Sequence, residues 1–114
     1  MNKKYYDIYL ILKKLGFKSS NYGTKLLTKV ILEASKSEDE IHLKDIYSTI
    51  SKTNNIPPND IQRLIFYAIN SRNKNLSKKN FKDIFGYEYD EGLFVCKELV
   101  EYLAEIIDEE KYGV

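Results

Sequence analysis

The sequence predicts an all-α protein. Apolar residues recur at spacings of three and four along most of the chain, and no convincing strand pattern is present. The chain has 114 residues, the length of one ordinary domain, and its 43% apolar content is enough to build a hydrophobic core. We therefore expect a single helical domain over residues 1–114, with about six helices.

The first two helices are expected at about residues 5–15 and 22–35, and each carries one apolar stripe. The first stripe consists of Ile8, Ile11, Leu12 and Leu15. The second consists of Leu26, Leu27, Val30, Ile31 and Ala34. Gly16 follows the first helix as its natural end, because glycine tolerates left-handed backbone angles.

The third helix is expected at about residues 43–52, followed by a turn at residues 53–55. The fourth begins at Pro58, whose missing N–H costs nothing in a first helical turn. Its apolar stripe is the clearest in the chain and consists of Ile61, Leu64, Ile65, Ala68 and Ile69. At about 100° per residue, its outward face collects Asn59, Gln62, Arg63, Phe66, Tyr67 and Asn70.

The last two helices are expected at about residues 77–85 and 91–110. Ser77 is the predicted N-cap of the first of them, and Gly86 ends it. Asp90 is the candidate cap of the second, which should bury Phe94. Its other predicted core residues are Leu99, Leu103 and either Ile106 or Ile107.

The net charge of +1 hides a strong asymmetry. Residues 1–82 carry 16 basic and 7 acidic side chains, whereas residues 83–114 carry 2 basic and 10 acidic ones. A basic body with an acidic C-terminal segment suggests a polyanion as partner. The alternative is that the acidic and basic helices pair with each other inside the fold.

The composition argues against an enzyme and against a metal protein. A single histidine, His42, and a single cysteine, Cys96, cannot build a common zinc site, and Cys96 is expected in the core. No glycine-rich phosphate loop or catalytic triad is visible, so no catalytic residue, cofactor or small-molecule ligand is expected. The longest apolar run is four residues, and no signal peptide is apparent, so a cytoplasmic location without membrane attachment is expected.

Three stretches together resemble a known family of DNA-binding domains. ILKKLGFKSSNYGTKLLTKVILEA contains Leu15-Gly16, Gly23 and Leu26-Leu27 at the family's spacing. IYSTISKTNNIPPNDIQRLIFYAI matches the family's helix-turn-helix at Tyr47, Ile50, Lys52 and Asn54. DIFGY matches its Phe-Gly-Tyr step at Phe85, Gly86 and Tyr87. Over about residues 5–107, the chain resembles the C-terminal effector domain of the sporulation response regulator, stage-zero sporulation protein A.

This resemblance implies an all-helical fold with an embedded helix-turn-helix at about residues 43–71. The family places its recognition helix in the major groove of double-stranded DNA. It binds commonly as a tandem pair on adjacent sites, so a homodimer or a tandem pair on DNA is expected here. A receiver domain, which controls the full-length regulators by phosphorylation, is not visible in this sequence.

The family's recognition helix reads Pro-Ser-Arg-Val-Glu-Arg-Ala-Ile-Arg-His-Ala-Ile, where this chain has PNDIQRLIFYAI. The buried positions agree, but Arg63 is the only identical polar residue. The expected base readers are Asn59, Gln62, Arg63, Phe66, Tyr67 and Asn70. The expected phosphate contacts are Lys52, Arg72, Lys74, Lys78 and Lys79, although these residues also fit a solvated loop.

Two residue choices within this helix leave alternatives open. Asp60 either faces the DNA groove or stabilises the positive N-terminal end of the helix. Phe66 and Tyr67 either contact thymine methyl groups or form an apolar patch for a protein partner. The leading hypothesis is a small sequence-specific DNA-binding protein, acting as a transcription regulator or as a plasmid or phage accessory factor. The alternative is a protein-interaction module that binds or antagonises a homologous regulator without reading DNA.

Overall fold

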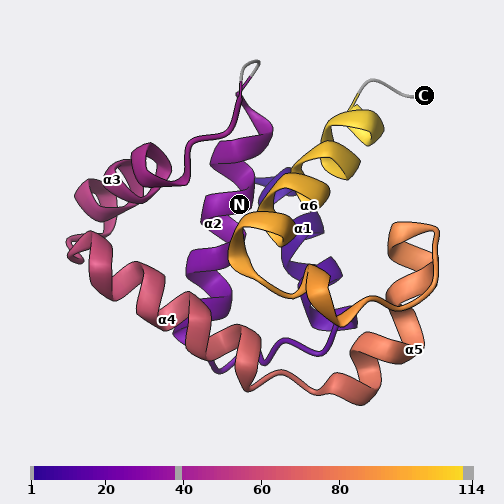
Figure 1. Ribbon diagram of the computed structural model, residues 1–114. Helices are drawn as coiled ribbons and strands as arrows, with labels where there is room; N and C mark the ends of the chain where they lie inside the picture. The colour runs from indigo at the N-terminus through magenta and orange to yellow at the C-terminus, as the bar shows by residue number, and fades with distance from the viewer. Residues whose placement is uncertain (1, 38–39, 112–114) are drawn as a thin grey trace.

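The computed structural model describes residues 2–37 and 40–111, with side chains up to Asp108 (Figure 1). Within these ranges it contains six α-helices, one short 3-10 helix and no strand, which confirms the all-α prediction. The elements are α1 (Lys3–Lys14), α2 (Tyr22–Ser35), α3 (Leu43–Asn54), α4 (Pro58–Asn70), α5 (Lys74–Phe85), η1 (Glu91–Leu93) and α6 (Cys96–Lys111).

Helix α2 is the centre of the fold, and α1, α3, α4 and α6 all pack against it. Its apolar stripe is completely buried at Leu26, Leu27, Val30 and Ile31. The other helices supply fully buried partners, among them Ile8, Leu12, Ile61, Ile65, Leu99 and Leu103. The core residues predicted for the first, second, fourth and last helices are therefore confirmed, apart from Ile11 and Leu64, which are partly buried. Of the alternatives Ile106 and Ile107, Ile107 is the buried one.

A close approach between α2 and α4 fixes the position of α4. Gly23 lies against the backbone of α4, and a Cβ atom there would overlap the carbonyl oxygen of Leu64. The Asn21 side chain caps α2 by accepting from the Gly23 N–H at 2.9 Å and donates to Ser71 Oγ at 3.2 Å. One residue thus joins the start of α2 to the end of α4.

The turn between α3 and α4 lies two residues later than predicted. Helix α3 continues to Asn54, and the connection consists of Asn55, Ile56 and Pro57. Asn55 adopts the left-handed conformation with φ 55°, which asparagine tolerates better than most residues. The Ile56 N–H donates to the Ser51 carbonyl, so the chain reverses tightly before Pro58 opens α4.

The start of α5 was predicted wrongly. The helix begins at Lys74, and its N-cap is Asn73, whose side chain accepts from the N–H groups of Asn75 and Leu76. Ser77 is instead completely buried, and its hydroxyl donates to the Leu15 carbonyl. Ser77 therefore ties α5 to the end of α1 rather than capping a helix.

The last helix also begins later than predicted. Asp90 caps only η1, accepting from the Gly92 N–H at 2.9 Å. Helix α6 begins at Cys96, and Phe94 is buried in the short segment between η1 and α6. This segment runs back towards α4, so the start of α6 contributes to the surface beside α4.

Candidate nucleic-acid interface

The outward face of α4 presents all six of the predicted base readers to solvent. Asn59, Gln62, Arg63, Phe66, Tyr67 and Asn70 are all exposed. Phe66 and Tyr67 retain 57% and 65% of their accessible surface, which is unusual for aromatic side chains on a helix that packs well on its other side. The opposite side of α4 holds Ile61 and Ile65 in the core, so the backbone that carries this face is rigidly supported.

Polar contacts within α4 hold part of this face. The Arg63 guanidinium lies 3.7 Å from the Asp60 carboxylate, in an ion pair between two well-exposed side chains. Asn70 Nδ2 donates to the Phe66 carbonyl at 2.9 Å. Asp60 lies in the first turn of α4, where the positive end of the helix dipole stabilises its negative charge.

Two hollows lie along one edge of the α4 face. The larger, of about 530 Å³, lies between the first turns of α3, α4 and α6, and Lys44, Asn59, Gln62 and Lys97 are among its lining residues. The smaller, of about 270 Å³, is mostly apolar and is lined in part by Phe66, Asn70, Phe94 and Val95. Gln62 and Cys96 border both hollows, so together they form a continuous edge of α4.

Sequence reasoning missed Lys44, Val95 and Lys97 as neighbours of the α4 face. Lys44 is exposed in the first turn of α3, where it lines the hollow together with Leu43 and Tyr47 of the same helix. Val95 and Lys97 come from a segment that begins 25 residues after the end of α4 at Asn70. Only the tertiary fold brings this segment beside α4, so periodicity could not reveal it.

The predicted phosphate-binding lysines are exposed, but they lie at two separate ends of α4. Lys52 is in the last turn of α3, just before α4 begins. Lys74, Lys78 and Lys79 are on α5, beyond the C-terminal end of α4 (Figure 1). The Lys78 ammonium also lies 5.9 Å from the ring centre of Tyr89, a partner within the protein.

Arg72 corrects the prediction, because its side chain is inside the protein and only 1% exposed. Its guanidinium donates to the Ile69 carbonyl at 2.8 Å, to Ser77 Oγ at 3.0 Å and to Glu91 at 2.9 Å. It also lies 3.7 Å from the ring centre of Phe94. A guanidinium paired in this way joins α4, α5 and η1 and is not available to a DNA phosphate.

The Glu91 carboxylate that meets Arg72 is partly exposed. A hydrogen bond donated by Tyr89 at 2.6 Å is the main cause that lowers the pKa of Glu91, and Arg72 lowers it further. Both contacts favour the ionised carboxylate. The cluster of Arg72, Tyr89, Glu91 and Phe94 is therefore an internal support of the fold.

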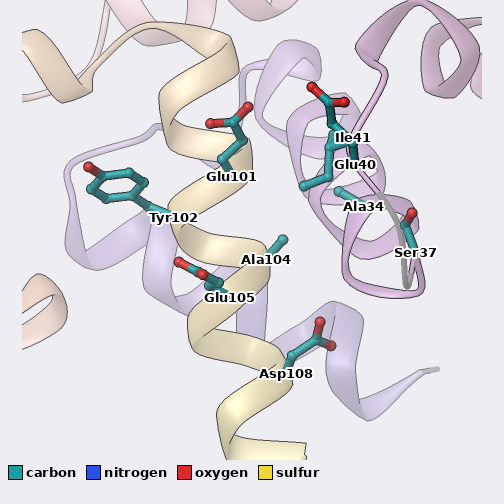
Figure 2. A pocket seen from close by; sticks show the side chains of 9 residues that line it. All are labelled: Ala34, Ser37, Glu40, Ile41, Glu101, Tyr102, Ala104, Glu105 and Asp108. Carbon is teal, nitrogen blue, oxygen red and sulfur yellow. The ribbon is translucent and has the colours of Figure 1, made fainter.

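Three carboxylates of the acidic helix α6 line a groove that shares no residue with the two hollows beside α4. Glu101, Glu105 and Asp108 line a groove of about 450 Å³, together with Glu40 and Ile41 from the segment before α3 (Figure 2). The three carboxylates of α6 lie beyond the first turn of this helix, and Figure 1 shows that its C-terminal part points away from α4. Where α6 comes near α4, at its first turn, it contributes Lys97.

Pairing of acidic and basic segments does occur within the fold. Lys4 meets Asp108 at 3.5 Å, Arg72 meets Glu91 and Lys82 meets Glu88 at 2.9 Å. These pairs neutralise part of the charge asymmetry. Six lysines near α4 take part in none of the ion pairs found among the described residues, namely Lys44, Lys52, Lys74, Lys78, Lys79 and Lys97.

Cys96 and His42, the residues with the most reactive side chains, show no sign of catalytic activation. Cys96 is partly buried, and its sulfur lies 3.0 Å from the Tyr47 hydroxyl. Burial raises the pKa of the Cys96 thiol, so it stays protonated near neutral pH. His42 is exposed at the N-cap of α3 and makes no side-chain capping bond.

Across residues 2–37 and 40–108, no group of three or more histidine, cysteine or carboxylate side chains is arranged to hold a metal ion. No described helix combines the length and apolarity needed to cross a bilayer. Comparison with known proteins found no matching family model, no similar curated protein and no similar solved structure.

Proposed function

We propose that this protein is a small sequence-specific DNA-binding protein, acting as a transcription regulator or as an accessory factor of a plasmid or phage. The observation that carries the proposal is the surface of α4. One rigidly supported helix presents hydrogen-bonding and aromatic side chains along its whole outward face, and exposed lysines lie near both of its ends. The partner is double-stranded DNA, and the function is binding rather than catalysis.

The proposal takes α3 and α4 as a helix-turn-helix, with α4 as the recognition helix. In this motif, the second helix enters the major groove while the first helix crosses the backbone. The three-residue connection and the left-handed Asn55 are compatible with such a motif. The resemblance of the sequence to the sporulation effector domain supports the same assignment.

The exposed side chains of α4 match the chemistry of the major groove. Arg63 can donate two hydrogen bonds to guanine, and Gln62 can make a bidentate contact to adenine. Phe66 and Tyr67 offer apolar surface to thymine methyl groups, and Asn59 and Asn70 offer further hydrogen bonds. Arg63 must release Asp60 to do so, at small cost because exposed ion pairs contribute little.

The direct test is fluorescence anisotropy with mixed-sequence and AT-rich duplexes over a series of salt concentrations. We expect log Kd to rise linearly with the logarithm of the salt concentration, because phosphate contacts release counterions from the DNA. Absence of binding at ~50 mM salt, where phosphate contacts are strong, would refute the proposal. Selection from a random duplex library then gives the preferred site.

The variant Arg63→Ala tests the assignment of the reading face. On the preferred site, we expect a loss of about 1–3 kcal/mol and a relaxed preference at one base position. Lys25→Ala, an exposed substitution on α2, is the matched control and should leave binding unchanged. An equal loss on every duplex would instead place Arg63 among the phosphate contacts.

A second function is favoured by one specific observation, the apolar edge of α4. Phe66, Tyr67 and Val95 are each more than half exposed, and Phe66 and Val95 border the 270 Å³ hollow. Such a surface suits a protein-interaction module that binds or antagonises a homologous regulator without reading DNA. A single protein captured from lysate, lost with Phe66→Ala/Tyr67→Ala, together with no DNA binding, would favour this function.

A further inference from the structure

The 530 Å³ groove beside α4 combines two lysines with two of the proposed base readers. Lys44 reaches it from α3 and Lys97 from α6, while Asn59 and Gln62 form its wall on α4. Among the residues that the structure describes, no acidic side chain lines it. We propose that this groove binds the phosphodiester backbone of the DNA strand next to the bases that α4 reads, with Lys44 and Lys97 as the phosphate contacts.

This inference rests on the proposed DNA-binding function and adds to it the place where one backbone lies. The dimensions of the two molecules support that place. An α-helix with its side chains is about 10–12 Å wide, and the major groove is about 12 Å wide. A helix in the major groove therefore has a phosphate backbone directly along its edge. The edge of α4 that carries Asn59 and Gln62 is the one that borders the 530 Å³ groove of the protein.

The charges at this edge are available to a ligand. Neither lysine takes part in an ion pair or side-chain hydrogen bond found among the described residues, in contrast to Lys4, Arg72 and Lys82. The carboxylates within four residues of either lysine are Glu40, Asp45, Glu98 and Glu101, and none of them lines the groove. Glu101 instead lines the acidic groove of Figure 2.

The position of Lys97 gives a separate reason for this assignment. Apart from Lys97 and Lys111, the charged residues of α6 are all acidic. Lys97 is the basic residue that lies where α6 approaches α4, so a helix that would otherwise repel DNA presents a positive charge there. Lys44 lines the same hollow from α3. The two lysines can therefore contact neighbouring phosphates of one DNA strand.

The test compares Lys44→Gln, Lys97→Gln and the double variant with the parent protein and with Lys25→Gln. Binding to the preferred duplex and to an unrelated duplex is measured by anisotropy from ~50 mM to 1 M salt. Each removed phosphate contact should reduce the salt slope by about 1 and weaken binding by about tenfold at 50 mM, equally on both duplexes. Thermal melting checks that all four variants are folded.

The outcomes separate this inference from the proposed function. If the parent protein binds neither duplex, the proposed function fails, and the inference fails with it. If the parent binds but Lys44→Gln/Lys97→Gln has the same slope and affinity as Lys25→Gln, only the inference is overturned. If the double variant loses affinity on the preferred duplex alone, the two lysines read bases, and the backbone assignment is wrong.

Discussion

Thr24 is the residue whose environment departs most clearly from ordinary packing. Its side chain is completely buried in the first turns of α2, and its hydroxyl has no hydrogen-bond partner among the described residues. A buried hydroxyl without a partner costs roughly 1–3 kcal/mol, whereas a methyl group of the same shape costs nothing in desolvation. The position therefore favours an apolar β-branched residue.

We predict that Thr24→Val stabilises the protein by about 1 kcal/mol, because valine keeps the shape and removes the unpaired hydroxyl. Urea unfolding followed by circular dichroism measures the change. Thr28→Val is the matched control on the same helix. The Thr28 hydroxyl donates to the Thr24 carbonyl at 2.8 Å, so its removal should not stabilise. A less stable Thr24→Val protein would contradict the prediction.

Gly23 limits the approach of α2 to α4 in a way that helix propensity alone would misjudge. In an exposed helix, Gly→Ala stabilises by about 1 kcal/mol. At Gly23, the added Cβ overlaps the Leu64 carbonyl and crowds Ala68 Cβ at 2.9 Å. We predict that Gly23→Ala instead destabilises by at least about 2 kcal/mol, since backbone atoms of α4 must shift.

Chemical denaturation of Gly23→Ala measures this effect, with Gly86→Ala as the comparison. Gly86 has φ +84°, but a Cβ there meets nothing within 4 Å. Its cost is therefore only the left-handed backbone of about 1–2 kcal/mol. If DNA binding is confirmed, Gly23→Ala should also weaken it by displacing α4. Equal stability of parent and Gly23→Ala would show that the two helices can separate freely.

At the scale of elements, the residues around Arg72 explain why α5 and η1 stay in place although α5 packs mainly on α1. The guanidinium satisfies groups from α4, α5 and η1 together and stacks on Phe94. Ser77 extends this connection to the Leu15 carbonyl at the end of α1. Arg72, predicted as a phosphate contact, thus connects α4, α5 and η1, and Ser77 connects them to the end of α1.

We predict that Arg72→Ala lowers the free energy of unfolding by about 2–4 kcal/mol, because a buried, paired group is removed and its partners are left unsatisfied. The exposed Lys74→Ala should change stability by less than about 0.5 kcal/mol. Urea titration measures both. If Arg72→Ala is as stable as the parent, Arg72 does not support the fold from inside and is available to contact DNA.

Glu91 makes the stability of this joint depend on pH. Folding lowers the pKa of Glu91 below its ordinary value of 4.5, mainly through the Tyr89 hydrogen bond and then through Arg72. Its contribution is therefore fully present above about pH 4.5 and is lost as the pH falls through the lowered value. We predict that Glu91→Gln is less stable than the parent at pH 7 and that this difference narrows towards pH 3, measured by thermal melting. A difference independent of pH would contradict the assignment.

Helix positions were largely predictable from the sequence, and their junctions were not. The predicted bounds of α2 and the predicted start of α4 are confirmed, because both helices pack on the core along one apolar face. Serine is a common N-cap residue, so the local sequence predicts a cap at Ser77, but its tertiary hydrogen bond to Leu15 outweighs that local preference. The local sequence of Arg72 predicts a surface cation, because nothing in it signals burial beside Glu91, 19 residues away.

At the scale of the whole molecule, the acidic groove and the lysines beside α4 lie in different places. The groove containing Glu40, Glu101, Glu105 and Asp108 lies towards the C-terminal end of α6, whereas Lys97 and Lys44 lie beside α4. The molecule measures 36 × 33 × 27 Å along its principal axes. The Debye length is about 8 Å at 0.15 M ionic strength and about 30 Å at 0.01 M. Glu105 follows Lys97 by eight residues on α6, about 12 Å along the helix axis, so its charge is largely screened at Lys97 in 0.15 M salt but not in 0.01 M salt.

This argument predicts the effect of Glu40→Gln/Glu105→Gln, which removes two exposed carboxylates from the acidic groove. If α4 binds DNA, the double variant should bind DNA more tightly than the parent at about 0.01 M salt. At about 0.15 M salt the two proteins should bind equally well, because counterions then screen the repulsion between the acidic groove and the DNA phosphates. Both residues are exposed and take part in no ion pair found among the described residues, so thermal stability should be unchanged. Tighter binding that persists at 0.15 M would place the acidic groove next to the bound DNA, on the same side of the molecule as α4.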